Sequence, residues 1–237
     1  PGWMLLSYGK KVSVSSSLEG YPAENIVDED ARTAWVAQSN RDMEWAQVDL
    51  QRLSSIHAIQ VNFDEYGANQ KGAVSGVYQS YLIYASVNGE DWSLVVDYGT
   101  KKTDTPHDYI EFEEPFKARY IKLQNKEYMV SENFSVRDLR IFGKGQGSTP
   151  RAVNDFTVER DEADPCKARL CWEAVPDAQG YIVRYGIAGD KLYNNFQVMG
   201  ENTLEIGSLN KGVAYYFTID AYNENDITRT SRIKVCR

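Results

Sequence analysis

Three successive acidic residues, Asp28, Glu29 and Asp30, place carboxylates side by side, and the hydroxyl group of Thr33 follows close behind. Hard cations such as Ca²⁺ bind about six to eight oxygen atoms from carboxylates, hydroxyls and main-chain carbonyls. The spacing therefore favours a structural Ca²⁺ site in this segment. The alternative is an acidic turn that only faces solvent.

Aromatic and basic side chains on three polar segments suit a different ligand, a sugar. Sugar rings expose C–H faces that stack on aromatic rings, and their hydroxyls pair with polar groups such as arginine. For each residue, packing within a loop or against a neighbouring domain is an equally good interpretation. Each candidate lies on one of the three segments: Arg41 in 38–42, Tyr66 and Tyr78 in 64–78, and Tyr128 and Phe134 in 125–134.

The sequence lacks the usual combinations of catalytic residues. Its 237 residues include only two His and three Cys, and no G-x-S-x-G, Walker loop or H-E-x-x-H motif occurs. With 34 acidic residues, some pair of carboxylates will reach the spacing of a glycosidase by chance, so such pairs carry no weight. We therefore predict that this chain is not an enzyme.

Composition excludes several further classes of protein. The chain is 42% hydrophobic and 12% aromatic, which is too apolar for a disordered protein. A net charge of −8 argues against nucleic-acid binding, which needs a basic face. No apolar run approaches the roughly 18 residues of a membrane span, so we expect no membrane insertion.

The stretch Gly-Lys-Gly-Gln-Gly-Ser-Thr-Pro at 143–150 divides the chain. Glycine adds backbone freedom and proline removes a hydrogen-bond donor, so this composition is typical of a linker. We predict a first domain over 1–143, a linker over 144–151 and a second domain over 152–237.

Both domains have the alternating apolar pattern of β-strands. Ala46 to Leu50 and Ile56 to Phe63 each present one apolar face, and Asn88-Gly89 marks a tight hairpin turn. No segment predicts a long amphipathic helix. The pattern predicts an all-β chain, with a jelly-roll sandwich followed by an immunoglobulin-like sandwich. Further strands are expected at 81–87, 92–96, 109–112, 119–123, 136–142, 156–158, 168–172, 181–185, 195–199, 203–206, 215–222 and 232–235.

Several blocks of the first domain resemble discoidin-like (coagulation factor type C) modules. They are Tyr8 to Ser17, Tyr21 to Trp35, Trp45 to Leu50, Tyr84 to Trp92, Ala118 to Leu123 and Asp138 to Gly143. Within this family, the sugar-binding family 32 carbohydrate-binding modules of bacteria are most similar, because the first domain has no Cys to staple its ends as phospholipid-binding members do. The resemblance implies that Trp35, Trp45 and Trp92 pack in the core.

The resemblance also implies a set of Ca²⁺ ligands. One departure is Glu29, where the family commonly has Gly, and a bulkier residue there could alter the turn. The implied ligands are the side chains of Asp28, Thr33 and Asp138 and the main-chain carbonyls of Asn25, Asp30 and Arg137.

The second domain resembles fibronectin type III domains. Leu209 and Tyr215 are similar to that fold's tyrosine corner, and Trp172 to its core tryptophan. This topology brings the first turn and the end of the last strand to one end of the sandwich, so it predicts a Cys166–Cys236 disulfide.

The pair of domains is similar to the C-terminal accessory modules of bacterial glycoside hydrolases, family 43 xylosidase and arabinofuranosidase relatives among them. The resemblance implies a secreted, periplasmic or cell-surface region that binds polysaccharide or oligosaccharide for a covalently linked catalytic domain upstream. The alternative is a structural or protein-interaction module that packs on a catalytic domain, with the second domain as a spacer.

Overall fold

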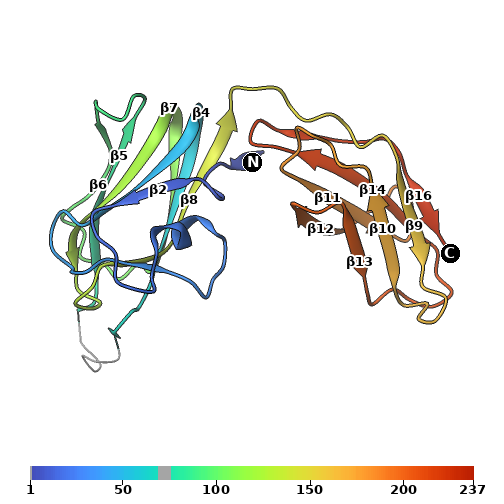
Figure 1. The fold of residues 1–237 in the computed structure, drawn as a ribbon, viewed down its shortest axis with the longest axis horizontal. Helices are drawn as coiled ribbons and strands as arrows, with labels where there is room; N and C mark the ends of the chain where they lie inside the picture. The colour runs from blue at the N-terminus through green and yellow to red at the C-terminus, as the bar shows by residue number, and fades with distance from the viewer. Residues whose placement is uncertain (1, 69–75) are drawn as a thin grey trace. The chain divides into compact units, whose positions relative to one another are not determined.

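The computed structural model describes residues 2–68 and 76–237, and nearly all of its regular structure is β-strand (Figure 1). The described part includes one complete 3₁₀ helix, η1 (Ala23–Val27). The prediction of an all-β chain is therefore confirmed. The chain forms two compact units, residues 3–146 and 147–237. No helix in the described ranges is both long and apolar enough to cross a membrane.

Two long antiparallel strands, β4 (Trp45–Phe63) and β7 (His107–Tyr128), organise the first unit. They pair along their length, with register shifts between Asp49 and Ser54 and between Ile56 and Ala58. Gln51 lies within the first shift and has a left-handed backbone, with φ of 66°. The sequence predicted two strands in place of each long one, because a bulge interrupts the alternation of side chains.

The remaining strands attach to different halves of β4 and β7 and so build two layers. The first half of β4 pairs with β2, and the second half of β7 pairs with β5, which carries β6. The second half of β4 pairs with β8, which also carries β1 and β3. These strands are β1 (Met4–Leu5), β2 (Lys11–Val14), β3 (Trp35–Val36), β5 (Gln79–Ser86), β6 (Ser93–Tyr98) and β8 (Ser135–Gly145).

One hydrophobic core fills the first unit, and both long strands contribute to it. Ile59 and Val61 come from β4, and Ile121 and Leu123 come from β7. Its largest fully buried side chains include those of Trp35, Tyr81, Tyr128 and Phe134.

The predicted linker at 144–151 is shorter in the structure. Strand β8 continues to Gly145, which pairs with Ser54 of β4. Further along, the N–H of Gly147 donates to Asn225 Oδ1 (2.8 Å), and the carbonyl of Ser148 accepts from Asn225 Nδ2 (2.8 Å). The glycines of this stretch thus belong partly to a strand and partly to the surface of the second unit.

The second unit is a sandwich of a three-stranded and a five-stranded antiparallel sheet. Trp172, which was predicted to be the core tryptophan, is buried, and so is Tyr215 of the expected tyrosine corner. The Tyr215 hydroxyl accepts a hydrogen bond from the N–H of Asn210 (3.2 Å) and ties β14 to the loop before it. The strands are β9 (Phe156–Arg160), β10 (Ala168–Trp172) and β13 (Thr203–Ile206) in one sheet, and β11 (Gly180–Gly186), β12 (Asn194–Met199), β14 (Tyr215–Tyr222), β15 (Ile227–Thr228) and β16 (Lys234–Cys236) in the other.

All three cysteines are free thiols, so the predicted Cys166–Cys236 disulfide is not formed in this structure. Cys236 points into the core of the second unit, where burial raises the pKa of its thiol. Cys166 is half-buried in the turn before β10. The topology places both residues at one end of the sandwich, but proximity of two elements alone does not orient two side chains for a disulfide.

Candidate functional site

The turn that follows η1 gathers several oxygen atoms. Thr33 Oγ1 lies 2.8 Å from Asp28 Oδ2 and 2.9 Å from the carbonyl oxygen of Asp30. Asp28 Oδ1 accepts the N–H of Asp30 (2.8 Å), which fixes the turn around the carboxylate. Asn25 closes the same segment by donating from Nδ2 to the carbonyl of Ala34 (2.8 Å).

Glu29 occupies the position where the resemblance expects glycine, and its backbone is left-handed, with φ of 60°. That conformation costs a non-glycine residue about 1–2 kcal/mol. The side chain of Glu29 forms a two-bond ion pair with Arg140 of β8 (3.0 and 2.9 Å), and this favourable contact offsets part of the conformational cost. The turn therefore keeps the backbone shape that glycine would give.

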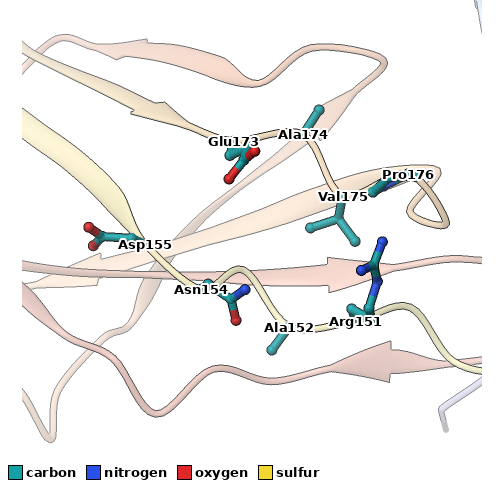
Figure 2. A pocket seen from close by; sticks show the side chains of 8 residues that line it. All are labelled: Arg151, Ala152, Asn154, Asp155, Glu173, Ala174, Val175 and Pro176. Atoms are coloured by element: carbon teal, nitrogen blue, oxygen red, sulfur yellow. The ribbon is translucent and has the colours of Figure 1, made fainter.

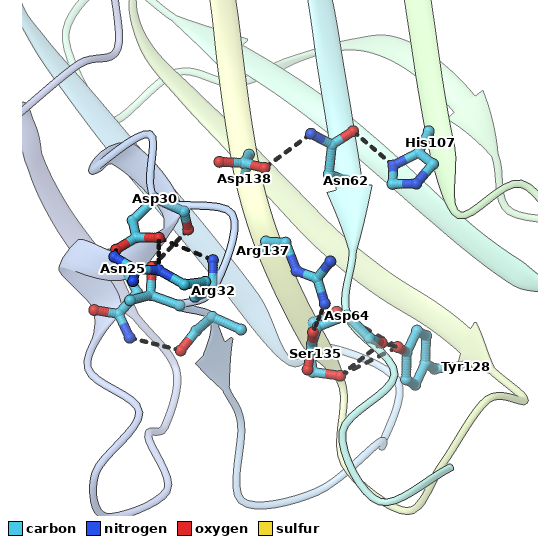
Figure 3. A network of polar contacts seen from close by, with 12 residues as sticks. Asn25, Asp30, Arg32, Asn62, Asp64, His107, Tyr128, Ser135, Arg137 and Asp138 are labelled. Carbon is cyan, nitrogen blue, oxygen red and sulfur yellow. Dashed lines mark hydrogen bonds and ion pairs between the residues drawn. The ribbon is translucent and has the colours of Figure 1, made fainter. Parts of the chain in front are cut away.

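Asp138 of β8 has a buried side chain, 7% exposed, that faces strand β4 (Figure 3). Its Oδ2 accepts from Asn62 Nδ2 (2.8 Å), and Asn62 Oδ1 lies 3.1 Å from His107 Nδ1. The neighbouring residue Arg137 directs its guanidinium to Asp64 instead. Asp138 is thus a buried carboxylate on the strand against which η1 packs.

The oxygen atoms of the turn fit a hard cation in their chemistry. A carboxylate, a hydroxyl and a main-chain carbonyl are the types of donor that Ca²⁺ binds. Thr33 Oγ1 lies within hydrogen-bond distance of the Asp28 carboxylate (2.8 Å) and of the Asp30 carbonyl (2.9 Å), so one donor of each type meets at this turn. No group of three His, Cys, Asp or Glu side chains suited to a metal occurs among the described residues, so carbonyl and hydroxyl oxygens would have to complete the shell.

The side chain of Asp30 already binds another residue, which agrees with the expectation that Asp30 would bind a cation only through its main-chain carbonyl. It forms a two-bond ion pair with Arg32 (3.0 and 2.8 Å). These hydrogen bonds lower the pKa of Asp30 to about 2. The carboxylate of Asp30 is therefore bound to Arg32, while its carbonyl oxygen lies beside Thr33 Oγ1.

Three loops of the first unit are joined at one end of the sandwich by hydrogen bonds. Asn125 Nδ2 donates to the carbonyls of Asn40 (2.8 Å) and Arg41 (3.0 Å), and Asn40 Nδ2 donates to the carbonyl of Ser131 (2.8 Å). The N–H of Met129 donates to the carbonyl of Tyr78 (3.0 Å). The structure thus brings together the three segments that the sequence singled out.

Tyr128 and Phe134, two of the five sugar-binding candidates, are core residues, which corrects the prediction. Each side chain is only 1% exposed, and the two rings contact each other with centroids 5.3 Å apart. The Tyr128 hydroxyl donates to the carbonyl of Asp64 inside the unit. Neither ring has a free face for a sugar.

The other three candidates remain accessible. Arg41 is exposed, and Tyr66 is half-buried, with its ring in an edge contact with Tyr21 (4.9 Å between centroids). Tyr78 donates from its hydroxyl to Glu127 (2.9 Å), and the ammonium of Lys102 lies 5.2 Å from its ring. Residues 69–75 of the predicted loop lie outside the described residues.

The sequence did not single out Tyr21, Lys102 and Glu127 as neighbours of these candidates. The hydrogen bond from Tyr78 lowers the pKa of Glu127, and the Lys102 ammonium acts in the same direction. Glu127 directly precedes Tyr128 in β7, and successive residues of a strand point to opposite faces. The side chain of Glu127 therefore faces outward while that of Tyr128 faces the core. This alternation at the end of β7 is the sequence signal that could have distinguished the two residues.

Trp45 and Trp92 were predicted to be core residues, and both are only half-buried. Trp35, by contrast, is fully buried and donates from Nε1 to the carbonyl of Ser16 (2.9 Å). Trp92 stands on the outer side of the layer that holds β5 and β6, in an edge contact with Tyr120 (6.5 Å). An aromatic surface therefore faces solvent there.

The second unit has a shallow pocket of about 210 Å³ that includes two acidic residues (Figure 2). Asp155 forms ion pairs with Arg232 (3.0 Å) and Lys234 (2.8 Å), and its pKa is lowered to about 2, chiefly by the hydrogen bond to Lys234. Glu173 is the second acid. With its lowered pKa and two cationic partners, Asp155 is suited to an ion pair rather than to proton transfer.

The family model of the F5/8 type C domain matches residues 11–138. Lactadherin of Rattus norvegicus is 33% identical over 110 residues, which cover 44% of this chain and 25% of lactadherin, so the match spans about a quarter of that protein. Chitosan-binding module 1 from a chitosanase/glucanase of Paenibacillus sp. IK-5 has a similar fold (TM-score 0.50, 20% identity, 59% of this chain and 99% of that one). Module 2 of the same enzyme, solved with chitotriose, is equally similar (TM-score 0.50, 19% identity, 58% and 99%). The chain belongs, through its first unit, to the F5/8 type C domain family.

Proposed function

We propose that the first unit binds carbohydrate without catalysing its cleavage, and that the joined loops at one end form the binding site. The observation that carries this proposal is that hydrogen bonds hold together, at one end of the unit, the loops that carry Arg41, Tyr66 and Tyr78. An accessible aromatic ring and a guanidinium group are the two partners that a pyranose needs. Family membership and the likeness of fold to chitosan-binding modules support the same function.

The second unit is proposed to be a fibronectin type III-like spacer. Its 3 + 5 strand arrangement and the hydrogen bond from Asn210 to the Tyr215 hydroxyl support this assignment. We further propose that the chain is an accessory region of a secreted bacterial glycoside hydrolase, related to family 43. In that setting, binding would raise the effective concentration of polysaccharide near a tethered catalytic domain.

A glycan microarray followed by calorimetry tests the loop site. We expect millimolar or tighter binding to at least one neutral glycan, and at least about tenfold weaker binding for Tyr66→Ala and Arg41→Ala, which corresponds to about 1.4 kcal/mol. Tyr109→Ala is the matched control, because Tyr109 is an exposed tyrosine on the first half of β7. If no glycan binds at millimolar concentration, a structural or protein-interaction module is the better interpretation.

We also propose that the oxygen cluster after η1 binds Ca²⁺ as a structural ion. Asp28 and Thr33 would supply side-chain oxygens and Asp30 its carbonyl, and the contacts of Thr33 Oγ1 with the other two oxygens support this set. Asn25, Arg137 and Asp138 are proposed to complete the shell by the family resemblance. The bound ion would fix the turn between η1 and β3.

Thermal unfolding with Ca²⁺ and with chelator tests this ion. At a free Ca²⁺ concentration of about 100 times Kd, binding should stabilise the first unit by about 2.7 kcal/mol. Asp28→Asn should abolish the difference, whereas Asp30→Asn should retain it, because only the carbonyl of Asp30 would bind. Equal midpoints of the wild-type protein in Ca²⁺ and in chelator would refute the site.

A further inference from the structure

The outer side of the layer formed by β2, β5, β6 and parts of β4 and β7 carries a row of aromatic and polar side chains. In register across three strands lie Tyr84 of β5, Lys122 of β7 and Gln47 of β4. Their neighbours Ile83, Ile121 and Val48 are buried in the core, so this row points the other way. Tyr84 and Lys122 are half-buried.

Lys122 lies among aromatic rings. Its ammonium is 4.2 Å from the centroid of the Trp92 ring and 5.5 Å from that of Tyr84. Such cation–π contacts hold the charge close to the sheet surface. Partial burial of the ammonium lowers the pKa of Lys122. Within the described ranges, no carboxylate lies within ion-pair distance of it.

The neighbouring cations of this layer already have partners. Arg119 forms a two-bond ion pair with Asp49 (2.8 and 2.9 Å), and Lys126 pairs with Asp42 (2.5 Å). Lys122 therefore carries a partly desolvated charge that the described chain does not neutralise. An anionic ligand could form a charge-assisted hydrogen bond with this ammonium group, and that bond is stronger than any that a neutral ligand could form there.

We propose that this face is a second ligand surface, distinct from the loop site, that binds a carboxylate-bearing sugar such as a uronic acid residue. The carboxylate would contact the ammonium of Lys122, which Trp92 holds in place. The C–H face of the sugar ring would stack on Tyr84. One sugar residue could touch both groups, since Lys122 Nζ is only 5.5 Å from the centroid of the Tyr84 ring.

Calorimetric titration with tetragalacturonic acid, and with cellotetraose as the neutral counterpart, tests this surface. We expect the acidic oligomer to bind and Lys122→Met to weaken it at least tenfold, while Lys122→Arg restores most of the affinity. Lys211→Met, at an exposed lysine of the second unit, should change the affinity less than twofold. Sodium acetate at the same carboxylate concentration should not compete, because it has no ring to stack.

A second readout uses the unaltered protein. In ¹H–¹⁵N spectra, tetragalacturonic acid should shift the indole signal of Trp92, identified with Trp92→Phe, and leave that of the fully buried Trp35 in place. Loss of acidic-sugar binding in Arg41→Ala but not in Lys122→Met would overturn the proposal and place these ligands at the loops. Absence of both heat and Trp92 shift at millimolar ligand would overturn it as well, whatever the neutral glycans do at the loop site.

Discussion

Phe134→Ala is expected to lower the free energy of unfolding of the first unit by about 3–5 kcal/mol, the usual cost of removing a buried phenylalanine ring. The ring is fully enclosed by aromatic neighbours. Its centroid lies 5.3 Å from that of Tyr128, 5.8 Å from that of Trp35 and 6.1 Å from that of Phe63. Alanine would leave a cavity that three large rings cannot close without moving from their rotamers.

Chemical denaturation followed by near-ultraviolet circular dichroism measures this loss. Tyr109→Ala is again the control, since its ring is 50% exposed, and we expect a change below about 1 kcal/mol. A Phe134→Ala protein with unaltered stability and reduced glycan affinity would contradict the structure, because it would mean that the ring faces a ligand.

Gly143→Ala is expected to destabilise the same unit by about 3 kcal/mol or more, the upper range for an overpacked site. A Cβ atom on Gly143 would lie 2.0 Å from the carbonyl oxygen of Ser55, which is backbone and cannot rotate away. Strands β4 and β8 pair at this point, so the clash would force the two strands apart.

Gly99→Ala is the matched control for this substitution. Its Cβ would lie 3.3 Å from Asp97 Oδ1 and from Leu82 Cδ2, both of which are ends of side chains that can shift. We expect the Gly99 variant to remain within about 1 kcal/mol of the wild type in the same denaturation experiment. Equal stability of the two variants would show that β8 does not approach β4 as closely as the structure has it.

The strands could be read from side-chain alternation, because each strand buries one face, and the division into two parts could be read from the Gly- and Pro-containing stretch at 143–150. The continuity of β4 and β7 could not, since irregularities between Asp49 and Ser54 and between Ile56 and Ala58 interrupt the alternation. Gly143 and Gly145 were interpreted as part of a linker, whereas in the structure both belong to β8. Composition does not distinguish a glycine that frees the chain from one that lets two backbones approach.

The candidate site was predicted in part. The turn at 28–33 was found because its ligand atoms are close in sequence, and the three loops because they are polar. Aromatic residues were assigned less well, since Tyr128 and Phe134 are buried while Trp45 and Trp92 are half-buried. Burial of a ring near a strand end depends on the strands that cover it, which local sequence does not specify.

Strands β4 and β7 each belong to both layers of the first unit, so neither layer can detach while the other stays intact. Unfolding of this unit should therefore be a single cooperative transition. A consequence is thermodynamic linkage: the turn after η1 packs against one layer, the row around Lys122 lies on the other, and occupancy of either site would stabilise the same folded state. Ion and sugar would then each raise the free energy of global unfolding of the whole unit, and so protect both sites, without touching.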